Sequence, residues 1–147
     1  MSLRDLYQEI IIDHGKSPRN VGKLTEATHA KAGHNPLCGD KLMVYLVLHD
    51  EIVDEVLFEG NGCAISMASA SLMTEIVKGK RLLEVEALFT DFHDLVISGV
   101  ANEEKNIGKL AVFSGVAEFP ARVKCATLAW HTMMAALKQN PDPVTTE

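Results

Sequence analysis

The chain has 147 residues and a net charge of −6, from 14 Lys and Arg against 20 Asp and Glu. This length suits one compact domain, so we expect a single domain over residues 1–147. The acidic balance argues against a nucleic-acid partner, because phosphate binding needs clustered basic side chains. No apolar stretch approaches the roughly 20 residues that span a bilayer. We therefore also expect no membrane partner.

The cysteines indicate a reducing compartment. The chain contains 3 of them, an odd number, whereas secreted scaffolds usually pair theirs. Residues 1–6 also turn polar too early for a secretory signal. A cytoplasmic location fits best, and there a thiol acts as a metal ligand, a nucleophile or a buried apolar group. Composition leaves the choice among these three open.

The N-terminal segment is predicted to be helical. Apolar side chains recur at helical spacing over residues 3–14, and Gly15 and Pro18 are expected to end the helix. Residues 19–40 hold several glycines and show no clear period, so we expect a long loop there. Loops of that length inside compact domains are often functional.

An antiparallel pair of strands is predicted next, followed by helices. Residues 41–49 are almost continuously apolar and rich in β-branched side chains, and residues 52–59 fit a returning strand. Helical periods then return over residues 66–77, which Gly79 ends, over 81–98, in a short helix from about 109, and over 120–137. The tail from about residue 139 is proline-rich and expected to be frayed. This order of elements indicates an α+β fold.

The first candidate for chemistry is Cys38-Gly39-Asp40, at the start of the first predicted strand. Side chains two apart in an extended segment point the same way, so the thiol of Cys38 and the carboxyl group of Asp40 would face one ion. Gly39 permits backbone conformations that other residues avoid. The alternative interpretation is a turn cysteine beside a solvated aspartate.

Cys63 follows Gly60-Asn61-Gly62 and directly precedes a predicted helix. A thiol in that position meets the unpaired N–H groups and the positive end of the helix dipole, which favours the thiolate. The alternative is a buried cysteine that closes the sheet, since free cysteines are among the most buried residues.

Cys125 lies near the start of the last predicted helix. At about 100° per residue, the apolar residues of this helix form one stripe, and Cys125 falls roughly 130° from its centre. A core cysteine should lie within the stripe, so the position indicates another role. Arg122 lies one helical turn earlier and is a candidate partner for a thiolate, although a solvated arginine is the simpler interpretation.

Together, the three cysteines and Asp40 supply four ligands of the kind that zinc or iron accepts. Each cysteine lies at the boundary of a predicted element, after a Gly or Pro break. The pattern predicts that the two glycine-containing loops and the last helix converge on one metal site. The 6 histidines are scattered, without the i, i+4 pairing of a helical metal site, and Cys125 and His131 lie on different helix faces.

Several segments of the sequence resemble one family. Asp13–Asn20, Asn35–Asp40, Gly60–Ser66 and Lys124-Cys125 are similar to segments of the NifU/IscU/SufU iron–sulfur assembly proteins, and the resemblance extends over about residues 3–138. The two cysteine-bearing motifs occur together and in order, which makes the match specific. The resemblance implies a SufU/IscU-like fold, with a small antiparallel three-stranded sheet packed against several helices.

Within the family, the chain resembles the SufU branch more than the IscU scaffolds. Scaffolds carry a histidine directly before the third cysteine, where this chain has Lys124. The interval between Cys63 and Cys125 is also longer, with the extra residues around 83–106. The resemblance to SufU implies a zinc-dependent sulfurtransferase, which accepts persulfide sulfur from a SufS-type cysteine desulfurase.

By motif position, the resemblance implies that Cys38, Asp40, Cys63 and Cys125 bind zinc. It also implies that Cys38 accepts the sulfur, and we expect Arg122 to steady the site when docking loosens Cys38 from the metal. Downstream iron–sulfur assembly proteins are further implied partners. Two alternatives stay open: a scaffold that holds iron as a [2Fe–2S] cluster on the same ligands, and a structural zinc adaptor that accepts no sulfur.

Overall fold

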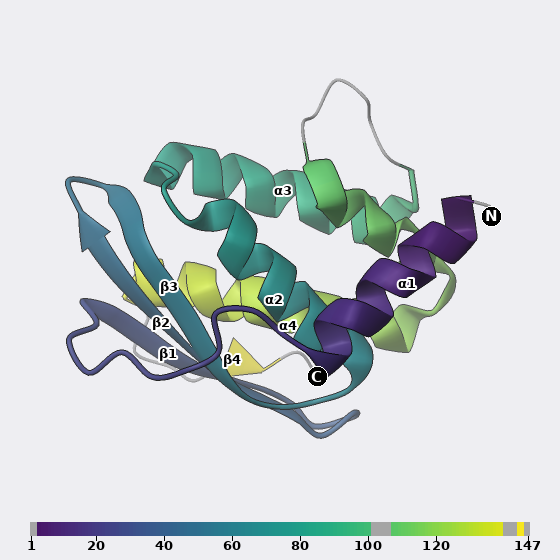
Figure 1. Ribbon diagram of the computed structural model, residues 1–147, viewed down its shortest axis with the longest axis horizontal. Coiled ribbons are helices and arrows are strands. Elements are labelled where there is room, and N and C mark those ends of the chain that lie inside the picture. Colours follow the sequence, from purple (N-terminus) through teal and green to yellow (C-terminus); the bar gives the residue numbers. More distant parts are fainter. Residues whose placement is uncertain (1–2, 101–106, 140–143, 146–147) are drawn as a thin grey trace.

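Figure 1 shows the computed structural model, which describes residues 3–100, 107–139 and 144–145. In chain order, its elements are α1 (Leu3–Lys16), β1 (His29–Asn35), β2 (Asp40–His49), β3 (Ile52–Asn61), α2 (Ala64–Val77), α3 (Leu82–Ser98), the 3-10 helix η1 (Gly108–Glu118), α4 (Pro120–Leu137) and β4 (Val144–Thr145). The predicted helices and both predicted strands are confirmed, with ends shifted by a few residues. No helix in the described ranges is long and apolar enough to cross a membrane.

The strands form one sheet in the order β3-β2-β1-β4. Strand β2 pairs antiparallel with β1 and β3, and the short β4 pairs parallel with β1. The α+β fold with a small antiparallel three-stranded sheet is confirmed, and β4 adds a fourth strand. This strand comes from the tail that we expected to be frayed, of which residues 140–143 and 146–147 lie outside the described part.

Strand β1 corrects the expectation of a long loop over residues 19–40. Its sequence, HAKAGHN, has no β-branched or large apolar side chain, so it lacks the composition typical of a strand. It forms because its backbone pairs with β2 along its whole length. Its small side chains also allow α4 to pack closely on the strand. A Cβ atom on Gly33, for example, would overlap Oγ1 of Thr132 in α4.

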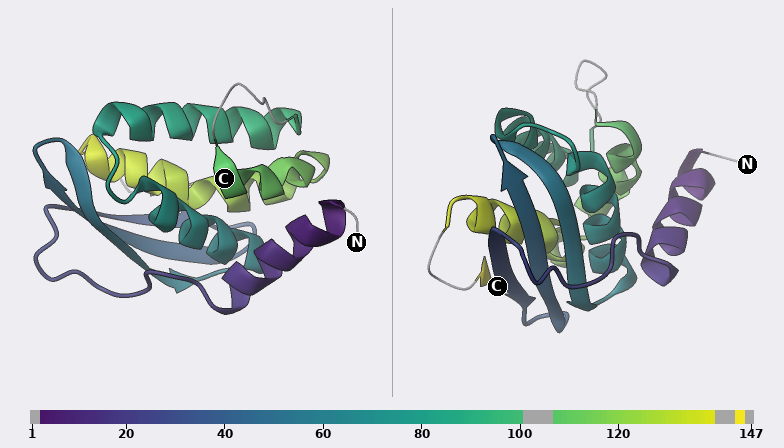
Figure 2. Two further views of the ribbon diagram at one scale, coloured as in Figure 1. Left: turned by 45° about the horizontal axis from the view of Figure 1, so that its top comes forward. Right: turned by 60° about the vertical axis from the view of Figure 1, so that its left-hand side comes forward.

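The molecule is built in three layers (Figure 1; Figure 2). Helices α2 and α4 lie against one face of the sheet, and α3 and η1 cover α4 on the side away from the sheet. Helix α1 packs beside α2 at one edge of the molecule. Helix α4 is therefore enclosed from several directions.

Aromatic side chains fill the core between the helices. Phe92 of α3 stacks on Trp130 of α4 with ring centroids 4.9 Å apart, and Phe113 of η1 meets Phe92 edge to face at 5.6 Å. All three side chains are fully buried. Burial of a side chain such as phenylalanine contributes about 1.5–3 kcal/mol, so this cluster helps to fix α4 over the sheet.

The segment Asp13–Asn20 fastens α1 to α2. The ring of His14 is buried, with Nδ1 2.7 Å from Oγ of Ser71. The same hydroxyl oxygen accepts the backbone N–H of Arg19 at 2.8 Å. The segment Asp13–Asn20, which resembles the family, therefore has a structural role: it holds the N-terminal helix in place.

Candidate metal centre

The β1–β2 hairpin presents Cys38 in its loop. Asn35 and Asp40 lie opposite each other as the last pair of the hairpin, and residues 36–39 connect them. Gly39 has a φ of 71°, in the left-handed region that glycine adopts most easily. A Cβ atom there would meet nothing within 4 Å, so glycine serves the backbone turn and not a close approach.

Three of the predicted ligands come together at this end of the sheet. Three ligand atoms lie within 4.8 Å of one another: Sγ of Cys38, one carboxylate oxygen of Asp40 and Sγ of Cys125. The thiol of Cys125 donates to the sulfur of Cys38, with 3.0 Å between the sulfur atoms. Cys38 is half-buried, whereas Asp40 and Cys125 are fully buried. The Cys38 loop and the last helix therefore converge, as the sequence predicts.

Both oxygens of the Asp40 carboxylate accept hydrogen bonds. The backbone N–H of Cys63 donates to Oδ1 at 2.9 Å, and the side-chain amide of Asn35 donates to Oδ2 at 3.2 Å. A fully buried carboxylate needs such donors, because an unpaired buried charge is costly. Each oxygen keeps a lone pair that a metal can take. Asp40 thus joins the Cys38 hairpin to the segment that begins α2.

Cys63 directly precedes α2, as its sequence position predicts. Its thiol is half-buried, and its charge and hydrogen bonding are among the lesser causes that raise the pKa of Cys125. A Cβ atom on Gly62 would lie 2.6 Å from Oδ1 of Asp40, so glycine is needed for the approach of this loop to the carboxylate. The group of three ligand atoms described above does not include Cys63, and its role as a ligand stays a prediction.

Cys125 corrects the argument from an apolar stripe. Residues 125–130 of α4 are all buried, because the helix lies between the sheet and the outer helices. A single stripe does not describe such a helix, and Cys125 is buried although it lies off the predicted one. Burial raises the pKa of the Cys125 thiol, and hydrogen bonds with Cys38 and Asp40 raise it further. A cation bound beside this sulfur would favour its thiolate form.

Arg122 reaches Cys38 from the first turn of α4. Its Nη1 lies 3.7 Å from Sγ of Cys38. The pKa of the Arg122 guanidinium is raised by a hydrogen bond with Cys125 and by the charges of Cys63 and Cys38. The arginine therefore has thiol partners, although its side chain remains exposed.

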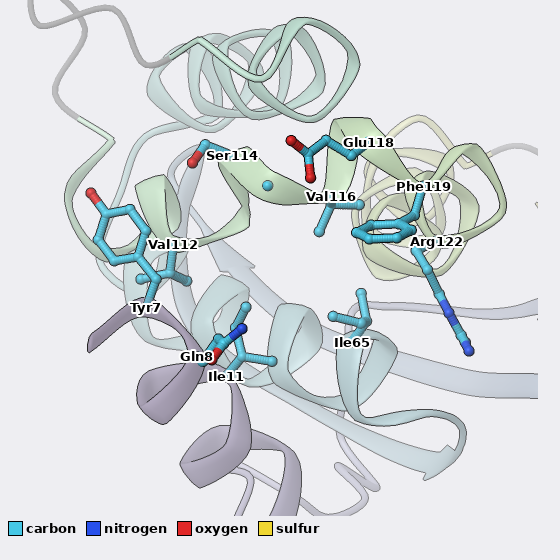
Figure 3. A pocket seen from close by; sticks show the side chains of 11 residues that line it. Tyr7, Gln8, Ile11, Ile65, Val112, Ser114, Val116, Glu118, Phe119 and Arg122 are labelled. Carbon is cyan, nitrogen blue, oxygen red and sulfur yellow. The ribbon is translucent and has the colours of Figure 1, made fainter. Parts of the chain in front are cut away.

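A cavity of about 420 Å³ opens beside the candidate site. Side chains of α1, η1 and the starts of α2 and α4 line it, and most of them are apolar. Figure 3 shows the ring of Phe119 turned toward the cavity and the guanidinium of Arg122 directed away from it. Arg122 thus connects the cavity wall with the sulfur of Cys38.

The donor set fits a tetrahedral metal such as zinc. Zinc binds thiolate sulfur at about 2.3 Å and carboxylate oxygen at about 2.0–2.2 Å, so the ligand atoms of one site lie roughly 3.5–4 Å apart. The mutual distances within 4.8 Å match this requirement closely enough for small side-chain shifts to complete the site. Iron accepts the same donors.

Comparison with known proteins decides the family. Residues 6–141 match the sequence pattern of the family described as NifU-like N terminal domain. The chain belongs to this family. A NifU-like crystal structure from Brucella abortus has a TM-score of 0.81 at 26% identity and covers 93% of this chain and 95% of its own.

Individual relatives place this NifU-like domain in iron–sulfur cluster assembly. It is 39% identical over 132 residues to the zinc-dependent sulfurtransferase SufU of Bacillus subtilis, covering 90% of this chain and 89% of SufU. It is 38% identical over 143 residues to the scaffold protein IscU of Thermotoga maritima, covering 97% and 100%. A crystal structure of a SUF-system scaffold protein from Fervidobacterium islandicum has a TM-score of 0.83 at 32% identity, covering 92% of this chain and 99% of its own. Because the identities to SufU and IscU are almost equal, they support the family and not one branch.

Asn35 is the residue of this site that the sequence analysis missed. The sequence offers it only as the first residue of the segment Asn35–Asp40. Strand register is the signal that identifies it, because hairpin pairing puts Asn35 opposite Asp40. That signal required β1 to be recognised as a strand.

Proposed function

We propose that this protein is a zinc-dependent sulfurtransferase, which accepts persulfide sulfur from a SufS-type cysteine desulfurase. The observation that carries the proposal is the placement of Cys38, half-buried in a hairpin loop beside two fully buried ligand groups, those of Asp40 and Cys125. A sulfur acceptor must reach the donor of a partner protein, and Cys38 has the exposure for it. The similarity to a SufU protein with this activity supports the proposal.

Cys38, Asp40, Cys63 and Cys125 are the proposed zinc ligands. Zinc, when bound, would hold the thiolates deprotonated at neutral pH. The carboxylate of Asp40 is a harder and more exchangeable ligand than a thiolate, which would leave the site open to ligand exchange. Unpaired thiols of this kind are suited to the reducing cytoplasm.

In the transfer step, the thiolate of Cys38 attacks the outer sulfur of a persulfide on the desulfurase. A bond forms between Sγ of Cys38 and that sulfur, the sulfur–sulfur bond of the donor breaks, and the donor cysteine leaves as a thiolate. Cys38 then carries the persulfide, and the step needs no external oxidant or reductant. Downstream iron–sulfur assembly proteins would receive the sulfur by a second exchange of the same kind.

Arg122 is the proposed companion of Cys38 during transfer. Its guanidinium lies 3.7 Å from the sulfur, and a neighbouring positive charge stabilises a thiolate. Docking of the desulfurase would loosen Cys38 from the zinc, and Arg122 would then steady the released thiolate. Because its side chain is exposed, Arg122 can follow Cys38 when the loop moves.

A second candidate function is that of a scaffold, on which iron and sulfide assemble as a [2Fe–2S] cluster. The similarity to IscU of Thermotoga maritima and the thiolate-rich donor set favour it. Lys124, in the place of the histidine of the scaffolds, favours the sulfurtransferase. A structural zinc adaptor would bind zinc at the same ligands and accept no sulfur.

Persulfide formation on Cys38 tests the proposal. The zinc-loaded protein is incubated with a SufS-type desulfurase and cysteine, and peptide mass spectrometry then locates any added sulfur atom. We expect one sulfur on Cys38 and none in Cys38→Ser. Absence of added sulfur while the desulfurase is active would point to the adaptor, and a cluster absorbance that appears with iron would point to the scaffold.

A further inference from the structure

We infer that Asn35 is a positioning residue of the metal centre. Its side-chain amide hydrogen-bonds two ligands at once and raises the metal affinity of the site. The inference rests on the proposed function in so far as it places a metal at this site. Nδ2 of Asn35 lies 3.2 Å from Oδ2 of Asp40 and 3.4 Å from Sγ of Cys125. Asn35 is fully buried, so water does not compete for these hydrogen bonds.

The hairpin register explains how one side chain reaches both ligands. Asn35 and Asp40 are directly opposite in antiparallel strands, and opposite residues project from the same face of a sheet. Helix α4 packs on β1 and β2 and brings Cys125 to this pair. The amide of Asn35 therefore connects the hairpin that carries Cys38 with the helix that carries Cys125.

The orientation of the amide follows from the acceptor atoms that face it. Oδ1 of Asn35 is buried without a hydrogen-bond partner in the described part of the chain. The reversed orientation would turn this oxygen toward Oδ2 of Asp40 and bring two acceptors together. Leaving Oδ1 unpaired is the lesser cost when the facing atoms are acceptors, so the amide is oriented to donate to both Asp40 and Cys125.

The amide of Asn35 holds the carboxylate of Asp40 and the sulfur of Cys125 in one arrangement, which limits their motion before a metal binds. Groups that hydrogen-bond to metal ligands also fix their orientation, and their loss typically weakens metal affinity about 10–100-fold.

Substitution of Asn35 by leucine tests the inference, with Co²⁺ as the probe in place of zinc. Asn35→Leu keeps a side chain of similar size and removes both N–H donors. In the full-length, metal-stripped chain we expect Co²⁺ affinity, measured against a competing chelator, to fall about 10–100-fold. We also expect the thiolate-to-Co²⁺ charge-transfer band to move to lower energy, because the sulfur of Cys125 loses an electron-withdrawing donor.

Two further variants make the result interpretable. Ser66→Ala removes a buried hydroxyl that has no hydrogen-bond partner among the described residues, and it should bind Co²⁺ as the unmodified chain does. Asn35→Ser is smaller and still polar, and it cannot reach both ligands, so its affinity should lie between those of the unmodified chain and Asn35→Leu. If Asn35→Leu does not fold, a loss of affinity and a band shift in Asn35→Ser carry the test.

The outcomes separate this inference from the proposed function. Unmodified affinity and an unshifted band in folded Asn35→Leu or Asn35→Ser would overturn the role of Asn35, while sulfur acceptance on Cys38 would still stand. Absence of a charge-transfer band in the unmodified chain would remove the metal centre itself, and both proposals would fail. A weaker Co²⁺ affinity and a shifted band in the Asn35 variants, with neither change in Ser66→Ala, would support Asn35 as the positioning residue.

Discussion

The backbone N–H of Cys63 donates a 2.9 Å hydrogen bond to the carboxylate of Asp40, across a sequence separation of 23 residues. This bond fixes the start of α2 to the hairpin that carries Cys38. Asp40 is fully buried, and its other oxygen accepts the amide of Asn35. One carboxylate therefore organises both glycine-containing segments of the site before any metal is considered.

We expect Asp40→Ala to release zinc more slowly and to accept sulfur more slowly. A carboxylate is the most exchangeable of the proposed ligands, so its removal leaves a more inert site. Zinc release to a coloured chelator and persulfide formation on Cys38 measure the two effects. Asp40→Asn is the matched control, because its amide oxygen can still accept the N–H of Cys63. Sulfur transfer at the unmodified rate in Asp40→Ala would count against an exchangeable ligand.

We expect Arg122→Ala to lower the rate of persulfide formation on Cys38 about tenfold, the effect of losing one charged hydrogen bond of modest strength. Zinc content and unfolding temperature should stay unchanged, because the side chain is exposed and is not a proposed ligand. Arg122→Lys keeps the charge and should retain part of the rate. Loss of zinc from Arg122→Ala would show that the arginine supports the site itself and not the transfer step.

Stability is expected to fall in acid, partly through His14. Burial lowers the pKa of His14, and the charge of Arg19 lowers it further. As pH falls below about 6.5, the unfolded chain binds a proton that the folded chain resists, so the free energy of unfolding decreases. One such group contributes at most about 1.4 kcal/mol per pH unit.

Urea unfolding of the metal-free protein at pH 7.5 and at pH 5.5 measures this effect. His14→Asn should show a smaller loss of stability between the two conditions. A parallel substitution, His49→Asn, removes a histidine whose side chain is 73% exposed and serves as the comparison for the buried His14. Equal pH dependence in both variants would exclude His14 as a source. His131, whose pKa is also lowered by burial and by His93, accounts for a part that both variants keep.

The contact between β1 and α4 gives a prediction about stability. Gly33→Ala should destabilise the fold by about 1–3 kcal/mol, because the new Cβ atom would overlap Oγ1 of Thr132. Thr132→Ala in the same chain should restore much of that loss, since it removes the overlapping atom. Chemical unfolding of the two single variants and the double variant measures the coupling. Additive effects would show that the two residues do not press against each other.

The helices and the β2–β3 hairpin could be predicted because their signals are local. Continuous apolar residues over 41–49 and helical spacing in the second half of the chain survive in the folded structure. Strand β1 could not be predicted in this way, because its small and polar side chains are not typical of a strand. It forms through its pairing with β2 and its packing against α4. Gly33 is small because Thr132 lies against it, about 100 residues later in the sequence.

Three of the four predicted ligands, Cys38, Asp40 and Cys125, come together as expected, while the role of Cys63 as a ligand stays a prediction. The argument for Cys125 assumed a single apolar stripe, which does not describe α4, because this helix is enclosed on several sides. Its conclusion, a role other than that of a core cysteine, agrees with the position of Cys125 beside Cys38 and Asp40. The bond from Cys63 to Asp40 uses a backbone N–H, which no side-chain pattern encodes. The contact of Asn35 with Asp40 could be predicted only from the pairing register of β1, and the composition of β1 is not typical of a strand.

Alanine production by a SufS-type cysteine desulfurase tests the central claim most directly. The assay compares this protein added in zinc-loaded form, in metal-stripped form and as zinc-loaded Cys38→Ser. We predict that only the zinc-loaded, unmodified protein stimulates alanine formation, because transfer requires both the metal centre and the thiol of Cys38. Full stimulation by Cys38→Ser, or no stimulation by any form, would contradict the proposed sulfurtransferase.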